Sequence, residues 1–481
     1  LVGSEMCIRD SANTVPSGTT AGVSDIDAAG AALLSSRQTN TFTDVSAANT
    51  ASAITLDAGV TNSSSLELKT NTQAATATGS AAGNTVALSG TTVGTGVAIV
   101  SAQTSDDEST VTAATTGEAA ITAASLGATT ASSASLTDNT LQSRATGGTV
   151  TNTLTAAATT ITLQAPDTTA AAVIGNSALT SDTSLSGTVS GAYATLNDQL
   201  ISGDVTATTN STAAAKAGFN VDITGQVSNG SSINNDRNAM TAQAQGAVAT
   251  NTTTLAVGGT LSQGTTVAGA IANAAVIANI QELADGADVS ASVDTTADPS
   301  VLTSIGGVLD NSSVSTSNNK IQAFADGASA TNALTASATT LTTAANATGA
   351  PGSTNLTADA AFAVINRQDG GNAAVTAQLN DPISVKTTIT GNSSNSSVVS
   401  TGNVQDAFAT SNKSANSLAL SATTLTSDGA VVNNQNSDAQ VTSLVGATTA
   451  GVAGGVGANA GVVVEFDGTV TSNAVAVTGN V

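Results

Sequence analysis

The sequence predicts an all-β protein built as a β-solenoid, a β-helix-like stack of short strands. Aromatic residues make up 1% of the 481 residues, whereas hydrophobic residues reach 40%. Because large aromatic side chains supply much of the buried area in ordinary cores, the interior must be thin and lined with Val, Ile, Leu and Ala. Thr and Val favour strands, and Gly and Asn interrupt them at turns. A similar pattern recurs along the chain, as a stack of coils requires.

The repeat is anchored by an Asn that precedes a strand-like run, as in ATNALTASATTL and SANSLALSATTL. The five anchors are Asn84, Asn152, Asn251, Asn332 and Asn416. A second Asn lies thirteen residues before each of them: Asn71, Asn139, Asn238, Asn319 and Asn403. We predict that each anchor lies at a turn, where Asn tolerates left-handed φ, and that it bonds the same residue one coil away.

The anchor spacings of 68, 99, 81 and 84 residues suggest the size of one coil. They are close to whole multiples of a unit of about 16 to 17 residues, and a solenoid can gain or lose whole coils. We therefore predict a repetitive β region over residues 71–481, preceded by an incomplete repeat over 12–70. Tandem β-sandwiches of about 80 residues are the alternative, although such domains usually carry aromatic core residues.

Short alternating strands are expected within each repeat. Val375–Leu379, Ile383–Ile389 and Leu418–Leu420 alternate in the way that period two requires. The stretch Val267–Ala284 could instead form a helix, since it is rich in Ala and includes Glu and Leu, which are good helix formers.

Residues 1–11 differ in composition from the rest of the chain. The decapeptide LVGSEMCIRD resembles the translated frame of a transposase-type sequencing adapter, so we treat the segment as non-native. The only cysteine, Cys7, lies within it. We expect the remaining sequence to be an internal fragment of a longer chain.

Charge and composition exclude several classes of function. The net charge of −23 argues against nucleic acid, because phosphates require clustered Lys and Arg. No apolar run is long enough for a transmembrane helix. The sequence has no histidine, which removes the usual general base and the commonest transition-metal ligand, so we expect no enzymatic activity.

Few residues are candidates for chemistry. Asp106, Asp107 and Glu108 form the densest acidic group, which we interpret as a solvated turn rather than a glycosidase pair. Calcium prefers oxygen ligands, and its candidate ligands in this sequence are Asp285, Asp288, Asp294 and Asp298. Asn-x-Ser/Thr triplets at Asn62, Asn210, Asn251, Asn355 and Asn392 would accept glycans in a eukaryotic secretory protein.

Gly-Asn and Thr-Asn turns between Asn-x-Leu-x-Leu strands resemble the repeats of large bacterial β-strand-repeat surface proteins of the adhesin type. They also resemble curlin-type Asn/Gln repeats, whose regular short period is absent here. The first resemblance implies an extracellular structural or adhesive protein of a cell surface or biofilm matrix. Its partners would be other copies of itself or surface and matrix polymers. The alternative is a carbohydrate-active β-helix, such as a phage tailspike or a polysaccharide lyase.

Overall fold

The structure is a computed structural model of the 481-residue chain. It describes residues 25–27, 32–41, 43–50, 54–57, 60–94, 97–116, 120–125, 127–163, 172–175, 187–189, 191–211, 218–263, 273–295, 300–343, 360–380, 384–446 and 461–480.

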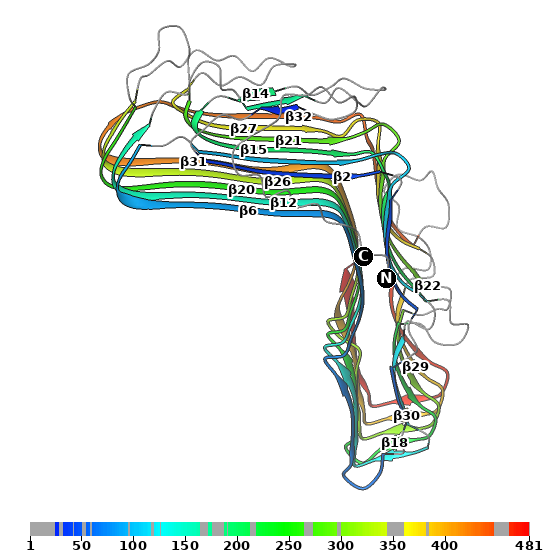
Figure 1. Ribbon diagram of the computed structural model, residues 1–481. Coiled ribbons are helices and arrows are strands. Elements are labelled where there is room, and N and C mark those ends of the chain that lie inside the picture. Colours follow the sequence, from blue (N-terminus) through cyan, green and yellow to red (C-terminus); the bar gives the residue numbers. More distant parts are fainter. Residues whose placement is uncertain are drawn as a thin grey trace.

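The predicted β-solenoid is confirmed: equivalent strands of successive coils pair in parallel and form long sheets (Figure 1). The first strand of each coil belongs to one six-stranded sheet, made of β2 (Ala32–Asn40), β7 (Val97–Ser105), β15 (Gly191–Ile201), β21 (Asn273–Leu283), β27 (Phe362–Asp369) and β32 (Gly429–Asn436). The second sheet contains β3 (Asp44–Asn49), β8 (Thr110–Thr115), β16 (Val205–Ser211), β22 (Asp288–Thr295), β28 (Ala374–Leu379) and β33 (Gln440–Val445). The third contains β4 (Ile54–Asp57), β9 (Ala120–Ser125), β17 (Gly218–Ile223), β23 (Val301–Ile305), β29 (Ser384–Ile389) and β34 (Gly461–Phe466).

The remaining strands close each coil. Two-residue strands form a turn column of β10 (Thr129–Thr130), β18 (Val227–Ser228), β24 (Leu309–Asp310), β30 (Ser393–Ser394) and β35 (Val470–Thr471). Short strands then lead into the long ones, namely β5 (Ser65–Lys69), β11 (Ser133–Thr137), β19 (Ser232–Asp236), β25 (Ser313–Ser315) and β36 (Ala474–Asn480). The long strands are β6 (Thr72–Val93), β12 (Thr140–Leu163), β20 (Ala239–Gln263), β26 (Lys320–Thr342) and β31 (Ser397–Thr426). A separate antiparallel sheet contains β1 (Asp25–Asp27), β13 (Ala172–Gly175) and β14 (Gly187–Val189).

One anchor spacing equals one coil, so the predicted unit of about 16 to 17 residues is wrong. Asn84 pairs with Asn152, Asn152 with Asn251, and the same register continues through Asn332 to Asn416. Coil lengths vary mainly where the chain leaves the long strand. β7 starts at Val97, soon after β6 ends at Val93, whereas β15 starts at Gly191, far beyond the end of β12 at Leu163. Continuous parallel pairing across all five anchors also rules out tandem β-sandwiches.

Each coil is L-shaped, with two arms joined where the long strand bends (Figure 1). Glycine recurs at one position of the long strands in the first four coils, at Gly79, Gly147, Gly246 and Gly327, where the regular pairing is interrupted. A Cβ atom on Gly246 would lie 2.4 Å from the carbonyl oxygen of Gly327 and 2.8 Å from the Leu283 side chain. Neighbouring backbones approach too closely at this position for a side chain, which explains the recurring glycine.

Small aliphatic side chains fill both arms. One core cluster lies between the second and third sheets and the first half of the long strands, and it includes Ile121, Leu136 and Ile223. A second cluster lies between the first sheet and the far half of the long strands, and it includes Ile99, Leu154 and Ile161. Tyr193, Phe219 and Phe362 are the largest fully buried side chains in the described part of the chain.

Local predictions were partly right. Val375–Leu379 and Leu418–Leu420 lie within β28 and β31, and most of Ile383–Ile389 forms β29. The suggested helix over Val267–Ala284 is wrong for residues 273–283, which form β21 and pair with both β15 and β27. Parallel pairing on both edges overrides the helical propensity of Ala, Glu and Leu there. The remainder of that stretch up to residue 272, and the adapter-like segment, lie outside the described residues.

Candidate functional site

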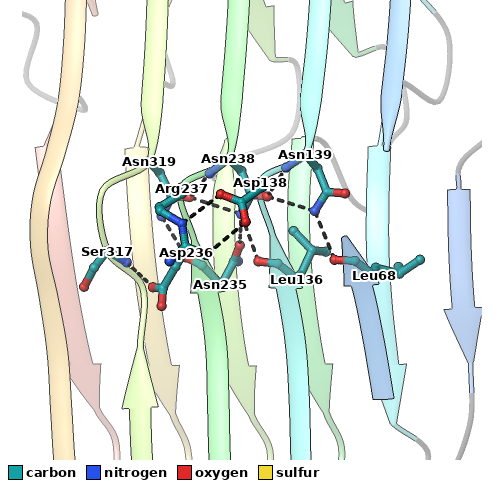
Figure 2. Close-up of polar contacts among 10 residues, drawn as sticks. All are labelled: Leu68, Leu136, Asp138, Asn139, Asn235, Asp236, Arg237, Asn238, Ser317 and Asn319. Carbon is teal, nitrogen blue, oxygen red and sulfur yellow. Dashed lines mark hydrogen bonds and ion pairs between the residues drawn. The ribbon is translucent and has the colours of Figure 1, made fainter. Parts of the chain in front are cut away.

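The first set of functional side chains is a ladder of asparagines at the entrance to the long strands (Figure 2). Each follows a residue with positive φ, for example Asp138 at 59° and Arg237 at 58°. In each coil the backbone N–H and Nδ2 of this Asn donate to Oδ1 of the equivalent Asn in the next coil. The four steps join Asn71, Asn139, Asn238, Asn319 and Asn403, with distances of 2.9 to 3.2 Å.

The same asparagines also donate hydrogen bonds to the preceding coil. Nδ2 of Asn139 donates to the Leu68 carbonyl, and Nδ2 of Asn238 donates to the Leu136 carbonyl. Asn139 is 1% exposed and Asn238 is 0% exposed. A short amide suits this position because it accepts on one side and donates on the other, so the amide oxygen and the amide nitrogen of Asn139 and Asn238 both have partners.

The anchor asparagines form a second ladder. Nδ2 of each donates to Oδ1 of the next, at 2.9 Å from Asn84 to Asn152 and at 2.8 Å for the three later steps, which join Asn152, Asn251, Asn332 and Asn416. The predicted bond from coil to coil is therefore present. The predicted position at a turn is wrong, because all five residues lie inside the long strands β6, β12, β20, β26 and β31.

A third column faces the anchors from the first sheet. Asn197, Asn279, Asn366 and Asn433 bond in sequence, with Nδ2 to Oδ1 distances of 2.7 to 2.8 Å. Cross-links join the two columns: Nδ2 of Asn251 donates to Oδ1 of Asn279, and Nδ2 of Asn332 donates to Oδ1 of Asn366, both at 3.3 Å. In the second coil Ser101 takes this place and donates to Oδ1 of Asn152.

A glutamine ladder lies in the first sheet, two residues after the Asn column. Its hydrogen bonds run in the opposite direction, from each coil to the preceding one. Nε2 of each Gln donates to Oε1 of the Gln in the preceding coil, through Gln38, Gln103, Gln199, Gln281, Gln368 and Gln435. In the four middle coils Nε2 also donates to a backbone carbonyl of the long strand, for example Gln199 to Val248. Sequence reasoning missed this ladder. Its signal is a Ser/Asn-x-Gln motif at Ser36, Ser101, Asn197, Asn279, Asn366 and Asn433.

Together the ladders form a buried polar seam between the two apolar cores. In the middle coils Asn251, Asn279, Gln281 and Asn332 are all 0% exposed. Buried amides are costly unless paired, and here each bonds chiefly to its own kind in a neighbouring coil, although Asn197 Oδ1 has no partner within the described residues. The seam therefore favours the one register in which amide lies on amide, since a shift of one residue would place the anchor asparagines beside outward-facing residues, such as Thr250 or Thr252 for Asn332, and would break the ladder.

The exposed ion pair beside the asparagine ladder has a smaller role. Arg237 Nε lies 2.8 Å from Asp138 Oδ1, and the two side chains are 53% and 32% exposed. The hydrogen bond from Arg237 lowers the pKa of Asp138, and the pair raises the pKa of Arg237. Solvent screening limits what such a pair contributes to stability.

Asp106, Asp107, Glu108 and Asp285 lie at turns between the first and second sheets, and Asp288 is the first residue of β22. Asp106 Oδ1 accepts a hydrogen bond from Ser109, while Asp107 and Glu108 are exposed. Asp285 accepts from the Asn372 N–H and Asp288 from the Ala374 N–H, so both bond to the backbone of the next coil. Asp294 lies in β22, and Asp298 lies outside the described residues. Within the described ranges, no group of three or more His, Cys, Asp or Glu side chains is arranged to hold a metal ion.

The asparagine triplets differ in accessibility. Asn62 and Asn392 are exposed at turns, whereas Asn251 is 0% exposed and belongs to the anchor ladder. A glycan on Asn251 would be incompatible with the folded coil. Asn355 and the side chain of Asn210 lie outside the described part.

Two ionisable groups are perturbed by burial in β15. Desolvation raises the pKa of Asp198 to about 7, although part of this residue reaches solvent. Desolvation also raises the pKa of Tyr193 to about 12. Such shifts can mark functional sites, but here burial alone accounts for both of them.

The outer face of the long strands carries columns of threonine. Thr151, Thr250 and Thr331 pair in register and are exposed. Two residues further on, Thr153 and Thr252 are aligned, followed by Thr155, Thr254 and Thr335. Adjacent parallel strands lie about 4.8 Å apart, so these hydroxyls form a regular two-dimensional array.

No protein-family profile matches this chain, and neither the curated proteins nor the solved structures include a significant match to it. The described residues include no helix of the length and apolar character needed to cross a membrane.

Proposed function

We propose that this protein is an extracellular structural or adhesive repeat protein of a cell surface or biofilm matrix. The observation that carries the proposal is the amide seam. Its side chains bond to equivalents in neighbouring coils, and this use of buried polarity favours a rigid, evenly spaced scaffold over a reaction centre.

The exterior supports an adhesive role. The threonine columns present hydroxyl groups at a fixed spacing, and each can donate and accept a hydrogen bond. Single contacts of this kind are weak, but many on one rigid face act together when the partner is a polymer with a repeating surface. The net charge of −23 favours neutral or cationic polymers over polyanions.

Location and adhesion can be tested separately. Antibodies against the folded chain should label intact cells of the source organism as strongly as permeabilised cells, and labelling that requires permeabilisation would contradict an extracellular role. Purified protein should co-sediment with an insoluble neutral polysaccharide such as cellulose. Replacing Thr151, Thr250 and Thr331 together with Lys should reduce that binding, and unchanged binding would remove the threonine face from the proposal.

A further inference from the structure

The outer face of β12, β20 and β26 is a regular, uncharged surface, which we call the threonine face. Each of these three strands is paired along both edges, so the face lies in the middle of the stack. Its outward positions are all Thr, Ala or Ser. They are Thr151, Thr153, Thr155 and Ala157 in β12, Thr250, Thr252, Thr254 and Ala256 in β20, and Thr331, Ala333, Thr335 and Ser337 in β26.

We propose that the threonine face binds the surface of ice crystals. The inference goes beyond the proposed function, because it names a crystalline ligand made of water and needs neither a cell surface nor a polysaccharide. It rests on three features of the face: the two-dimensional spacing of its hydroxyl groups, the freedom of those groups to bond with water, and the rigidity of the strands that carry them.

The hydroxyl groups are spaced regularly in two perpendicular directions. Thr151, Thr250 and Thr331 pair in register on three adjacent strands, which lie about 4.8 Å apart. Along one strand, alternate residues such as Thr250 and Thr252 are about 6.7 Å apart. Oxygen atoms on a prism face of hexagonal ice repeat at similar intervals along two perpendicular directions. Water molecules bonded to the threonine face therefore lie close to lattice positions of ice.

The outward hydroxyl groups are available to water. Within the described structure, those of Thr151, Thr250 and Thr331 make no hydrogen bond to another residue. By contrast, the buried hydroxyl groups of Thr195 and Thr253 lie 3.0 Å apart and bond to each other. A threonine hydroxyl both donates and accepts, as a water molecule in ice does, and the β-branched side chain is stiff at χ1. A lysine ammonium group would instead hold strongly bound water of its own, so an uncharged face suits an ice surface.

The anchor ladder holds this array rigid. Asn152, Asn251 and Asn332 alternate with the outward threonines, and each step between them is a 2.8 Å hydrogen bond from Nδ2 to Oδ1. These buried bonds fix the register of neighbouring strands, and with it the spacing of the hydroxyl groups. Ice is itself rigid, so many weak contacts add together only when the protein surface is ordered before binding.

Thermal hysteresis of the purified 481-residue chain tests the proposal, because a protein bound to ice lowers the freezing temperature of a crystal below its melting temperature. The parent chain should show this gap. Thr252→Lys, at the centre of the threonine face, should reduce the gap more than about fivefold, since a strongly hydrated ammonium group interrupts the array. Thr206→Lys is the matched control: Thr206 is equally half-buried and lies in the same coil, on the outer face of β16. This variant should keep the hysteresis of the parent.

A second variant and a second ligand complete the test. Thr331→Lys, on the neighbouring strand of the face, should also lose hysteresis, and circular dichroism would verify that each variant is folded. A parent chain with equal freezing and melting temperatures would overturn the inference, and so would equal losses from Thr206→Lys and Thr252→Lys. Co-sedimentation of the same samples with cellulose separates the two proposals. Cellulose binding without hysteresis would refute ice binding alone, whereas hysteresis without cellulose binding would support ice binding and refute adhesion to that polysaccharide.

Discussion

Replacing Asn332 with Ala should destabilise the protein by about 1–3 kcal/mol, the cost of leaving buried polar atoms without partners. Asn332 is 0% exposed. Its Oδ1 accepts from Asn251 at 2.8 Å, and its Nδ2 donates to Asn416 at 2.8 Å and to Asn366 at 3.3 Å. Asn251 keeps a second acceptor in Asn279, which limits the loss on that side.

Urea denaturation followed by circular dichroism measures the change in the free energy of unfolding. Thr335→Ala is the matched control in the same strand, since Thr335 is exposed, and it should cost under about 0.5 kcal/mol. Asn84→Ala should cost less than Asn332→Ala, because Asn84 lies in the first coil and makes ladder bonds on one side only within the described structure. Equal costs for Asn332→Ala and Thr335→Ala would refute the idea that the ladder stabilises the fold.

Four further substitutions test other parts of the account. Gly246→Ala should destabilise by about 1–3 kcal/mol, because its Cβ would overlap the Gly327 carbonyl, whereas Gly83→Ala, with nothing within 4 Å, should be neutral or slightly stabilising in the same denaturation assay. Arg237→Ala should cost less than about 1 kcal/mol, and a larger loss would show that the exposed ion pair matters more than screening allows. Asp198 has a folded-state pKa of about 7, above its ordinary 3.8, so the folded state holds this proton more tightly than the unfolded state does. The free energy of unfolding should therefore fall as pH rises from about 4 to about 7. Thermal melts of Asp198→Asn should lack that part of the decline, and an unchanged pH profile would contradict it.

The sequence contained enough information for the fold class and for the columns of the stack. Alternating strand formers and a nearly aromatic-free composition predict a thin parallel stack, and the Asn anchors predict its register. The predicted aliphatic packing is confirmed in the two core clusters, as in the Ile161, Leu261, Leu341 column, although a buried amide seam lies between them.

The size of the coil was not predictable from the anchor spacings alone. Dividing those spacings into short units assumed strands of ordinary length, but β31 spans 30 residues and β20 spans 25. A strand of this length exists only because its neighbours are equally long, and that information lies in the pairing of distant segments. Comparison of the Ser/Asn-x-Gln motif with the Asn anchors would have indicated one of each per coil.

The remaining misses have local causes. The anchor asparagines were expected at turns because isolated Asn favours left-handed φ, but in the stack the gain from amide pairing places them in extended strand. The Ala-rich segment at residues 273–283 has helical propensity, yet its alternation of Asn279 and Gln281 with apolar residues fits a buried strand. The recurring glycines, such as Gly246 and Gly327, could be identified as special only once the neighbouring backbones were known to approach so closely.

Disulfide formation between neighbouring coils tests the central claim, that one anchor spacing is one coil, most directly. In a Cys7→Ser background, Thr250→Cys and Thr331→Cys replace two exposed threonines that pair in adjacent strands. Their Cα atoms should lie about 4.8 Å apart, within the range a disulfide spans, so mild oxidation should cross-link them. The matched pair at 250 and 335 places the second cysteine about 13 Å further along the strand and should not cross-link. If coils were about 16 to 17 residues long, positions 250 and 331 would lie about 24 Å apart, and failure of that pair to cross-link in the folded protein would contradict the account.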